Sequence, residues 1–175
     1  LTAFSAFGAF SLFASLSPSF VKDLIPWHGP LVSGSAIASI LLVSAVVQFS
    51  AKHLPAAKSL SLGLMTLVVS FVLLGLCISM QWSILFFISD IMVGVGHGLG
   101  LLGAFGLIHQ MTTTDNRAAV MSTYLFIGYL GTIVPIIAVG YLADHFGLTT
   151  GVLGFCLGVG LLCLALIFWH KKISS

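Results

Sequence analysis

The sequence contains no glutamate and very little charge of either sign. Its 175 residues include six Lys and Arg and four Asp, so charged residues make up 6% of the chain while hydrophobic residues make up 59%. A soluble domain carries charge at about a quarter of its positions, so this composition excludes an ordinary soluble fold. A net charge of +2 is too small to favour a nucleic-acid partner. Without Glu, a His-Glu-x-x-His metalloprotease site is also excluded.

Cysteine is scarce as well. Cys77, Cys156 and Cys163 lie in apolar runs and form no Cys-x-x-Cys pair, which predicts buried thiols rather than a disulfide framework or a metal site. We expect no metal and no cofactor. The chain starts at Leu1 inside an apolar stretch, without the basic region and cleavage site of a signal peptide, so we expect it to be cut from a longer protein. Residues 170–175 predict a polar tail.

Long apolar runs dominate the chain. A hydrocarbon core about 30 Å thick is crossed by about 20 helical residues, and each crossing segment must be helical because lipid cannot satisfy backbone polar groups. The sequence predicts an all-α bundle of six such spans, at residues 2–21, 31–50, 60–79, 83–110, 119–142 and 151–169.

The positive charges predict the orientation of these spans. The links after the second and fourth spans and the C-terminus carry five of the six, namely Lys52, Lys58, Arg117, Lys171 and Lys172, and the other side carries only Lys22. The positive-inside rule therefore places link 51–59 and the C-terminus in the cytoplasm of a cell with this protein in its plasma membrane, the inner membrane in a bacterium. Trp27 and Trp82 then fall at the outer interface and Trp169 at the inner one.

The fourth span carries two polar residues far from its ends, Asp90 and His97. Seven residues make nearly two helical turns, so the two side chains share a face without touching, and each needs a partner elsewhere. An ionised group at this depth costs a few kcal/mol, so we expect Asp90 to face protein or water, or to keep its proton. Proton uptake and release could then be coupled to binding. The structural alternatives are a cap on a neighbouring helix for Asp90 and a bond to a backbone carbonyl for His97.

Small and aromatic residues suggest how these helices pack. Gly94 with Gly98 and Gly96 with Gly100 form small-xxx-small steps that allow close helix approach. In the first span, rings recur every third residue and fan across nearly half of the helix, at Phe4, Phe7, Phe10 and Phe13. The fan fits either an aromatic cavity or ordinary packing.

The fifth span carries a family resemblance. "TTTDNRAAVMSTY" followed by "GYLGTIVPIIAVGYLADHFG" resembles the link between the tenth and eleventh helices, and the eleventh helix itself, of the major facilitator superfamily. Pro135 removes a backbone donor inside this span, which predicts a bend near residues 131–135. The six spans and the internal C-terminus agree with helices seven to twelve of that fold.

The resemblance implies a twelve-helix transporter whose two halves rock around a midplane site. Residues 1–175 would be its C-terminal half, built as a 3+3 inverted repeat, and the missing N-terminal half, the lipid bilayer and a small-molecule substrate would be its partners. It implies secondary active transport. Asp90 and His97 suggest proton coupling, and an aromatic-rich cavity with few charges would favour amphiphilic compounds, whose export is one possible direction. Link 48–63 departs from the family, because Lys52 and Pro55 stand where the family has Asp and Gly, so we expect no charge latch there.

These arguments select two sets of residues and no catalytic ones. The candidates for substrate contact or proton coupling are Asp90, His97, Gln48, Phe7 and Phe10. The candidates for helix bending and conformational change are Gly131, Pro135, Gly140 and Arg117. Two other classes remain open: a six-span intramembrane hydrolase, although "VSGSAIAS" does not supply a Gly-x-Ser-Gly motif, and a channel or membrane assembly module.

Overall fold

The computed structural model describes residues 1–24 and 30–174, and the side chains of residues 1–15 and 31–169. In this part of the chain all regular secondary structure is helix, and each predicted span corresponds to one helix. The helices are α1 (Thr2–Leu24), α2 (Pro30–Ser50), α3 (Ala56–Met80), α4 (Ser83–Met111), α5 (Arg117–Phe146) and α6 (Leu148–Ser174).

The helices extend beyond the predicted spans, chiefly at α5 and α6. Helix α6 continues through Ser174, so the residues predicted as a polar tail extend this helix. Hydropathy detects the apolar part of a helix, whereas backbone hydrogen bonds carry the helix on into polar residues. Trp27 lies outside the described residues, as do the side chains of Lys22, Lys171 and Lys172.

Five helical segments are long and apolar enough to cross a membrane. They are Leu31–Ser50, Ala56–Met80, Ser83–Met111, Arg117–Phe146 and Leu148–Trp169. The part of α1 with described side chains, Thr2–Ser15, is a shorter apolar helix. The chain is therefore a helical membrane bundle, and the sixth span stays a prediction.

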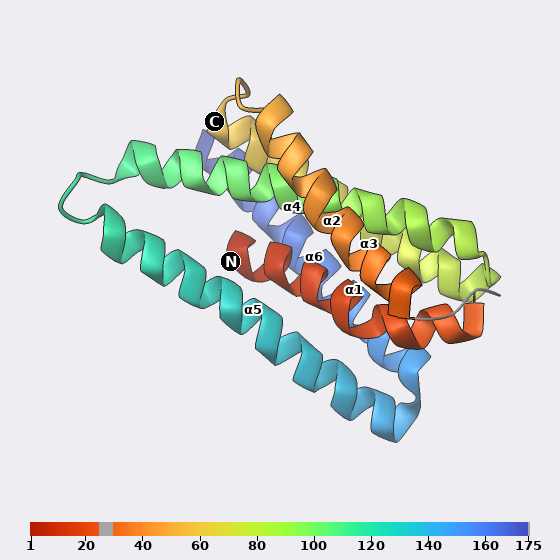
Figure 1. Cartoon of the computed structure of the whole chain (residues 1–175). Helices are drawn as coiled ribbons and strands as arrows, with labels where there is room; N and C mark the ends of the chain where they lie inside the picture. The colour runs from red at the N-terminus through yellow and green to blue at the C-terminus, as the bar shows by residue number, and fades with distance from the viewer. Residues whose placement is uncertain (25–29, 175) are drawn as a thin grey trace.

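The bundle is organised around α4 and α1 (Figure 1). Helix α4 packs against α3, α2 and α1, while α1 also packs against α5, and α6 packs against α3 and α5. Although a short link joins them, α4 and α5 diverge and make little contact, with α1 lying between them. Since the helices alternate in direction, the α2–α4 and α1–α5 pairs run parallel and α3–α4 runs antiparallel.

Helices α3 and α4 approach closely along a line of glycines. A Cβ on Gly63 would lie 2.6 Å from the backbone nitrogen of Gly100, and a Cβ on Gly103 would lie 2.5 Å from that of Leu60. These separations are shorter than any real Cβ contact, so only glycine allows the two backbones to lie this close. The close approach predicted at the Gly96–Gly100 step is confirmed.

Two buried serines add hydrogen bonds across the same interface. The Ser59 hydroxyl donates to the carbonyl oxygen of Leu99 at 3.0 Å, and the Ser89 hydroxyl donates to that of Ser70 at 2.8 Å. Each bond joins a hydroxyl to a backbone acceptor that cannot change its charge. This face of α4 is therefore fixed by packing and by neutral hydrogen bonds.

Candidate functional site

Asp90 and His97 lie beside the α3-facing side of α4 and bond to α2. Asp90 is 1% exposed and His97 is 7% exposed, which makes them the two titratable groups among the described polar residues of the core. The sequence predicted that each would need a partner on another helix. Both partners are serines of α2: Ser39 bonds to Asp90 and Ser44 bonds to His97. We call Asp90, His97, Ser39, Ser44 and Gln48 the polar seam.

The carboxyl group of Asp90 has one hydrogen-bond partner in the described part of the chain. Its Oδ2 atom bonds to the Ser39 hydroxyl. Its Oδ1 atom is buried and has no hydrogen-bond partner among the described residues. The Ser39 hydroxyl oxygen also lies 2.7 Å from the carbonyl oxygen of Ala36 in its own helix. Among the described side chains, the buried acid therefore has no cation beside it to balance a negative charge.

His97 lies in a larger cluster. Its Nδ1 atom is 3.0 Å from the Ser44 hydroxyl oxygen, and Gln48 Nε2 donates to the same oxygen at 3.2 Å. The rings of Phe7 and Phe10 flank the imidazole, with centroid separations of 5.7 and 5.8 Å. The structure thus brings together four predicted candidates, His97, Gln48, Phe7 and Phe10, from three helices.

Two glycines of α4 hold α2 close enough for these short side chains to meet. A Cβ on Gly94 would lie 2.9 Å from the carbonyl oxygen of Ile40, and a Cβ on Gly98 would lie 2.7 Å from that of Ser44. Because a serine hydroxyl reaches only a short distance from its own backbone, it contacts a group on another helix only where the helices nearly touch. The predicted Gly94–Gly98 step therefore places the polar partners.

Sequence reasoning missed Ser39 and Ser44. The available signal was their position in an otherwise apolar helix: Ser44 and Gln48 are four residues apart and so share a face, and Ser39 is five residues before Ser44. That spacing differs from the seven residues between Asp90 and His97. Only the crossing of the two helices brings both pairs into register, and sequence spacing does not reveal that crossing.

The phenylalanines of the first span do not all follow one of the two predicted alternatives, an aromatic cavity or ordinary packing. Phe13 is 2% exposed and stacks on Phe86 of α4 at 5.8 Å, which is ordinary core packing. Phe7 and Phe10 are half-buried and contact the imidazole instead. Only these two rings therefore belong to the polar seam's surroundings.

Gly131 and Pro135 pack against α1 rather than the seam. A Cβ on Gly131 would lie 2.5 Å from the Cα atom of Phe4, and a Cβ on Gly8 would lie 3.7 Å from Pro135 Cγ. Both residues are buried, and α5 runs through Pro135 without a break in the helix. They form the strip on which α1 rests, and the bend stays a prediction.

The remaining two candidates lie apart from the seam. Gly140 is exposed, and a Cβ placed on it would meet no atom within 4 Å. Arg117 is half-buried, and its Nε atom donates to the Thr112 hydroxyl at 3.4 Å, which ties the start of α5 to the end of α4. The structure does not bring either residue to Asp90 or His97.

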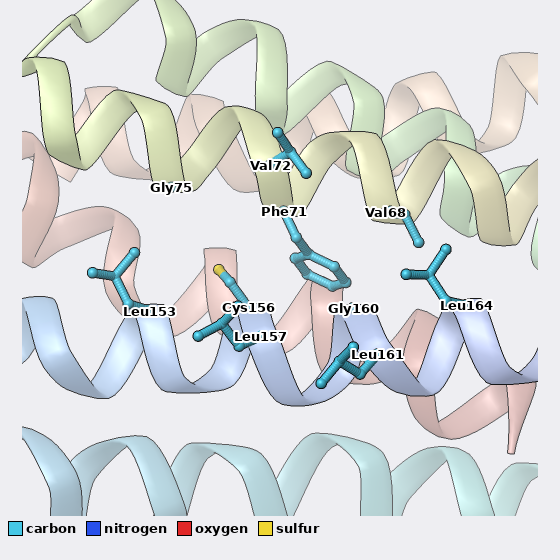
Figure 2. A pocket seen from close by; sticks show the side chains of 10 residues that line it. All are labelled: Val68, Phe71, Val72, Gly75, Leu153, Cys156, Leu157, Gly160, Leu161 and Leu164. Atoms are coloured by element: carbon cyan, nitrogen blue, oxygen red, sulfur yellow. The ribbon is translucent and has the colours of Figure 1, made fainter.

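The hollow shown in Figure 2 is separate from the seam. It has a volume of about 250 Å³ and lies between α3 and α6, lined by Val68, Phe71, Val72, Gly75, Leu153, Cys156, Leu157, Gly160, Leu161 and Leu164. Its lining is apolar and includes no predicted site residue. A groove of about 380 Å³ lies where α4 ends and α5 begins, beside Tyr124 and Thr123.

The described side chains include no group of three His, Cys or Asp that could hold a metal ion. No protein-family model matches the sequence, and no curated protein is significantly similar to it. Fold and site together define a helical, membrane-embedded protein with one parallel helix pair joined through titratable groups. The resemblance to the major facilitator superfamily therefore rests on the residues of the fifth span.

Proposed function

We propose that the protein is a secondary active transporter that moves a small solute by alternating access and couples that movement to protons. The observation that carries the proposal is the polar seam, an acid and an imidazole buried between two helices of an apolar bundle. Ionisable groups in membrane helices are costly, and they mark ion or substrate pathways by default. Helix packing alone does not need them, because α3 joins α4 through serine hydroxyls and carbonyl oxygens.

The helix pairs support a six-helix half of the major facilitator type. In a 3+3 repeat, α1, α2 and α3 correspond to α4, α5 and α6. Under this correspondence, the parallel α1–α5 pair is equivalent to the parallel α4–α2 pair, and both pairs share extensive interfaces. The correspondence is incomplete, since the broad α3–α4 interface has only a slight counterpart between α6 and α1. Inverted repeats of this kind place the substrate site at the midplane between two halves.

The exposed side chains of the bundle support two proposed partners, the lipid bilayer and a second six-helix half. Large apolar side chains are exposed on α5, among them Phe126 at 63% and Ile137 at 66%. Lys52 on the α2–α3 link and Lys58 at the start of α3 are exposed, at the same end of the bundle as Arg117. We propose that this end and the C-terminus are cytoplasmic, in the plasma membrane, and that a second six-helix half completes the cavity.

The rings beside His97 support amphiphilic solutes as the substrate class. Phe7 and Phe10 offer aromatic surface to an apolar body, and His97 and Gln48 offer hydrogen-bonding groups to a polar end. Pockets for such molecules commonly combine an apolar lining with a few polar groups. Export of amphiphilic compounds is the direction that we propose.

The test is transport by the full-length protein, with both proposed halves, reconstituted in proteoliposomes with a panel of amphiphilic solutes and an imposed proton gradient. We expect Asp90→Asn to abolish gradient-driven movement and to leave solute exchange intact, because an amide cannot release a proton. Asp144→Asn, at an exposed position near the end of α5, is the matched control and should leave both activities unchanged. Gradient-driven transport by Asp90→Asn at the wild-type rate would contradict proton coupling at Asp90.

One observation favours a second candidate, an intramembrane serine hydrolase. Ser44 and His97 are within hydrogen-bond distance, as a nucleophile and its general base must be. However, Ser44 is only 3% exposed, and the other nitrogen of His97 has no described carboxylate or carbonyl to orient it. Covalent labelling of Ser44 by a fluorophosphonate probe would favour the hydrolase over the transporter.

A further inference from the structure

We propose that the polar seam is uncharged in this conformation: Asp90 carries a proton that it donates to Ser39, and His97 is a neutral imidazole that accepts a hydrogen bond from Ser44. The assignment comes from counting hydroxyl protons. Its consequence for transport rests on the proposed function, whereas the assignment itself does not.

Ser39 has one hydroxyl proton and two neighbouring oxygen atoms. Its hydroxyl oxygen is 2.7 Å from the carbonyl oxygen of Ala36 and also bonds to Asp90 Oδ2. If Asp90 were ionised, both neighbours would be acceptors, and one of the two contacts would have no proton between its oxygens. If Asp90 is protonated, its O–H donates to Ser39 and the Ser39 O–H donates to Ala36. Only the protonated acid satisfies both contacts.

The second oxygen of Asp90 agrees with this count. Oδ1 is buried and has no partner among the described residues. An ionised carboxylate shares its charge between both oxygens, so an unpartnered oxygen would leave buried negative charge without any donor. In a neutral acid the same atom is a carbonyl oxygen, whose missing hydrogen bond costs much less.

Ser44 shows the opposite arrangement. Ser35 and Ser39 each donate to a carbonyl in their own helix, whereas Ser44 has no such bond. Its oxygen accepts a hydrogen bond from Gln48 Nε2, which leaves its own proton free for His97 Nδ1. The ring proton of His97 is then on Nε2, and the imidazole is neutral.

No charged group described in the surrounding helices opposes this assignment. The described side chains of α1 and all of α2 include no titratable residue, and in α3 the titratable residues are Lys58, exposed at its start, and Cys77, whose thiol contacts the backbone of Phe86. On α5, Tyr124 packs its ring on Phe105 of α4, and Tyr129 packs its ring edge-on against Phe7. None of these groups faces Asp90 or His97 with a charge.

The proton therefore holds α2 against α4. When it leaves Asp90 for water or a solute, the carboxylate remains 1% exposed beside a hydroxyl whose proton already bonds to Ala36. The new charge needs donors, and these become available when Ser39 turns away from Ala36 and water enters as α2 moves off α4. Proton release and opening of the α2–α4 interface are then one event, which is what a proton-coupled carrier requires.

Infrared difference spectroscopy of the purified protein in lipid vesicles at neutral pH tests the assignment. We expect a carbonyl stretch of a protonated carboxylic acid that disappears in Asp90→Asn, a variant whose amide can still donate to Ser39 and keep the helices packed. Ser39→Ala should move this band to higher wavenumber, because the acid loses its hydrogen-bond acceptor. Ser35→Ala is the matched control, since Ser35 makes the same bond within α2, to Val32 at 2.8 Å, and no bond to α4.

Each outcome decides the assignment. If Asp90→Asn removes a carboxylate band instead of an acid band, or if Ser39→Ala leaves the acid band in place, the assignment is wrong. If the acid band responds as expected but Asp90→Asn leaves gradient-driven transport unchanged, the proton assignment holds and the proposed coupling fails. If the wild type shows no acid band but Asp90→Asn loses coupling, the proposed coupling holds and the proton assignment fails.

Discussion

The two faces of α4 both pack through glycine and serine, but the contacts that these residues make differ in kind. Towards α3, glycines let the backbones touch, and Ser59 and Ser89 donate to carbonyl oxygens. Towards α2, Gly94 and Gly98 also allow close approach, but the serines meet Asp90 and His97. The hydrogen bonds of the first interface join hydroxyls to carbonyl oxygens, whereas those of the second involve an acid and an imidazole, whose charges can change. Helix α4 thus has a permanent contact with α3 and a contact with α2 that protonation can alter.

The largest expected effect comes from the fixed face. Gly63→Ala places a Cβ 2.6 Å from the backbone nitrogen of Gly100, and a backbone atom cannot turn aside as a side chain can. We expect a loss of more than about 2 kcal/mol in the free energy of unfolding, as for overpacking in a tight core. Thermal unfolding of the protein in detergent measures it.

Gly158→Ala in α6 is the control for that experiment. A Cβ there meets no atom within 4 Å, so helix propensity alone should apply and stability should stay the same or rise by up to about 1 kcal/mol. Equal effects at Gly63 and Gly158 would mean that α3 and α4 do not pack as closely as described.

Two serine substitutions, one on each face of α4, should have intermediate effects on stability and should differ in their effect on transport. Ser59→Ala and Ser44→Ala each remove one interhelical hydrogen bond, so we expect each to cost about 1 kcal/mol of stability. Only Ser44→Ala should also impair proton-driven transport, because it leaves His97 without its partner. Parallel measurements of unfolding and transport check this, and equal impairment of transport by both would remove the distinction between the faces.

The smallest expected effect is at Gly140, which the sequence singled out for conformational change. Gly140→Ala meets open space, so its stability should match the wild type to within about 1 kcal/mol. A change in transport rate with stability unaltered would assign Gly140 to a contact made only in the complete transporter. If transport is unchanged too, Gly140 has no conformational role.

Much of this fold could be predicted from the sequence, because an apolar run long enough to cross a membrane must satisfy its backbone hydrogen bonds within a helix. The α4 glycines likewise predicted close packing, and Asp90 and His97 were recognisable as buried polar groups. Residue spacing in the sequence could not predict which side chains would bond to Asp90 and His97. Ser39 and Ser44 acquire their roles from the way α2 crosses α4, and Gly131 and Pro135, expected to bend α5, also pack against α1. Such properties depend on contacts between distant segments, which leave no periodic signal.

The glycines of α4 also set how freely this protein can change its sequence. Between Gly94 and Gly106, a side chain added at Gly94, Gly98 or Gly103 strikes the backbone of α2 or α3, so a substitution on either face requires a neighbouring helix to move. Most of α5 is exposed, and many of its positions can exchange one apolar residue for another without consequence inside this bundle. Among descendants of this sequence, variation should therefore gather on α5 and be almost absent from the middle of α4, even at positions that never touch a proton or a solute.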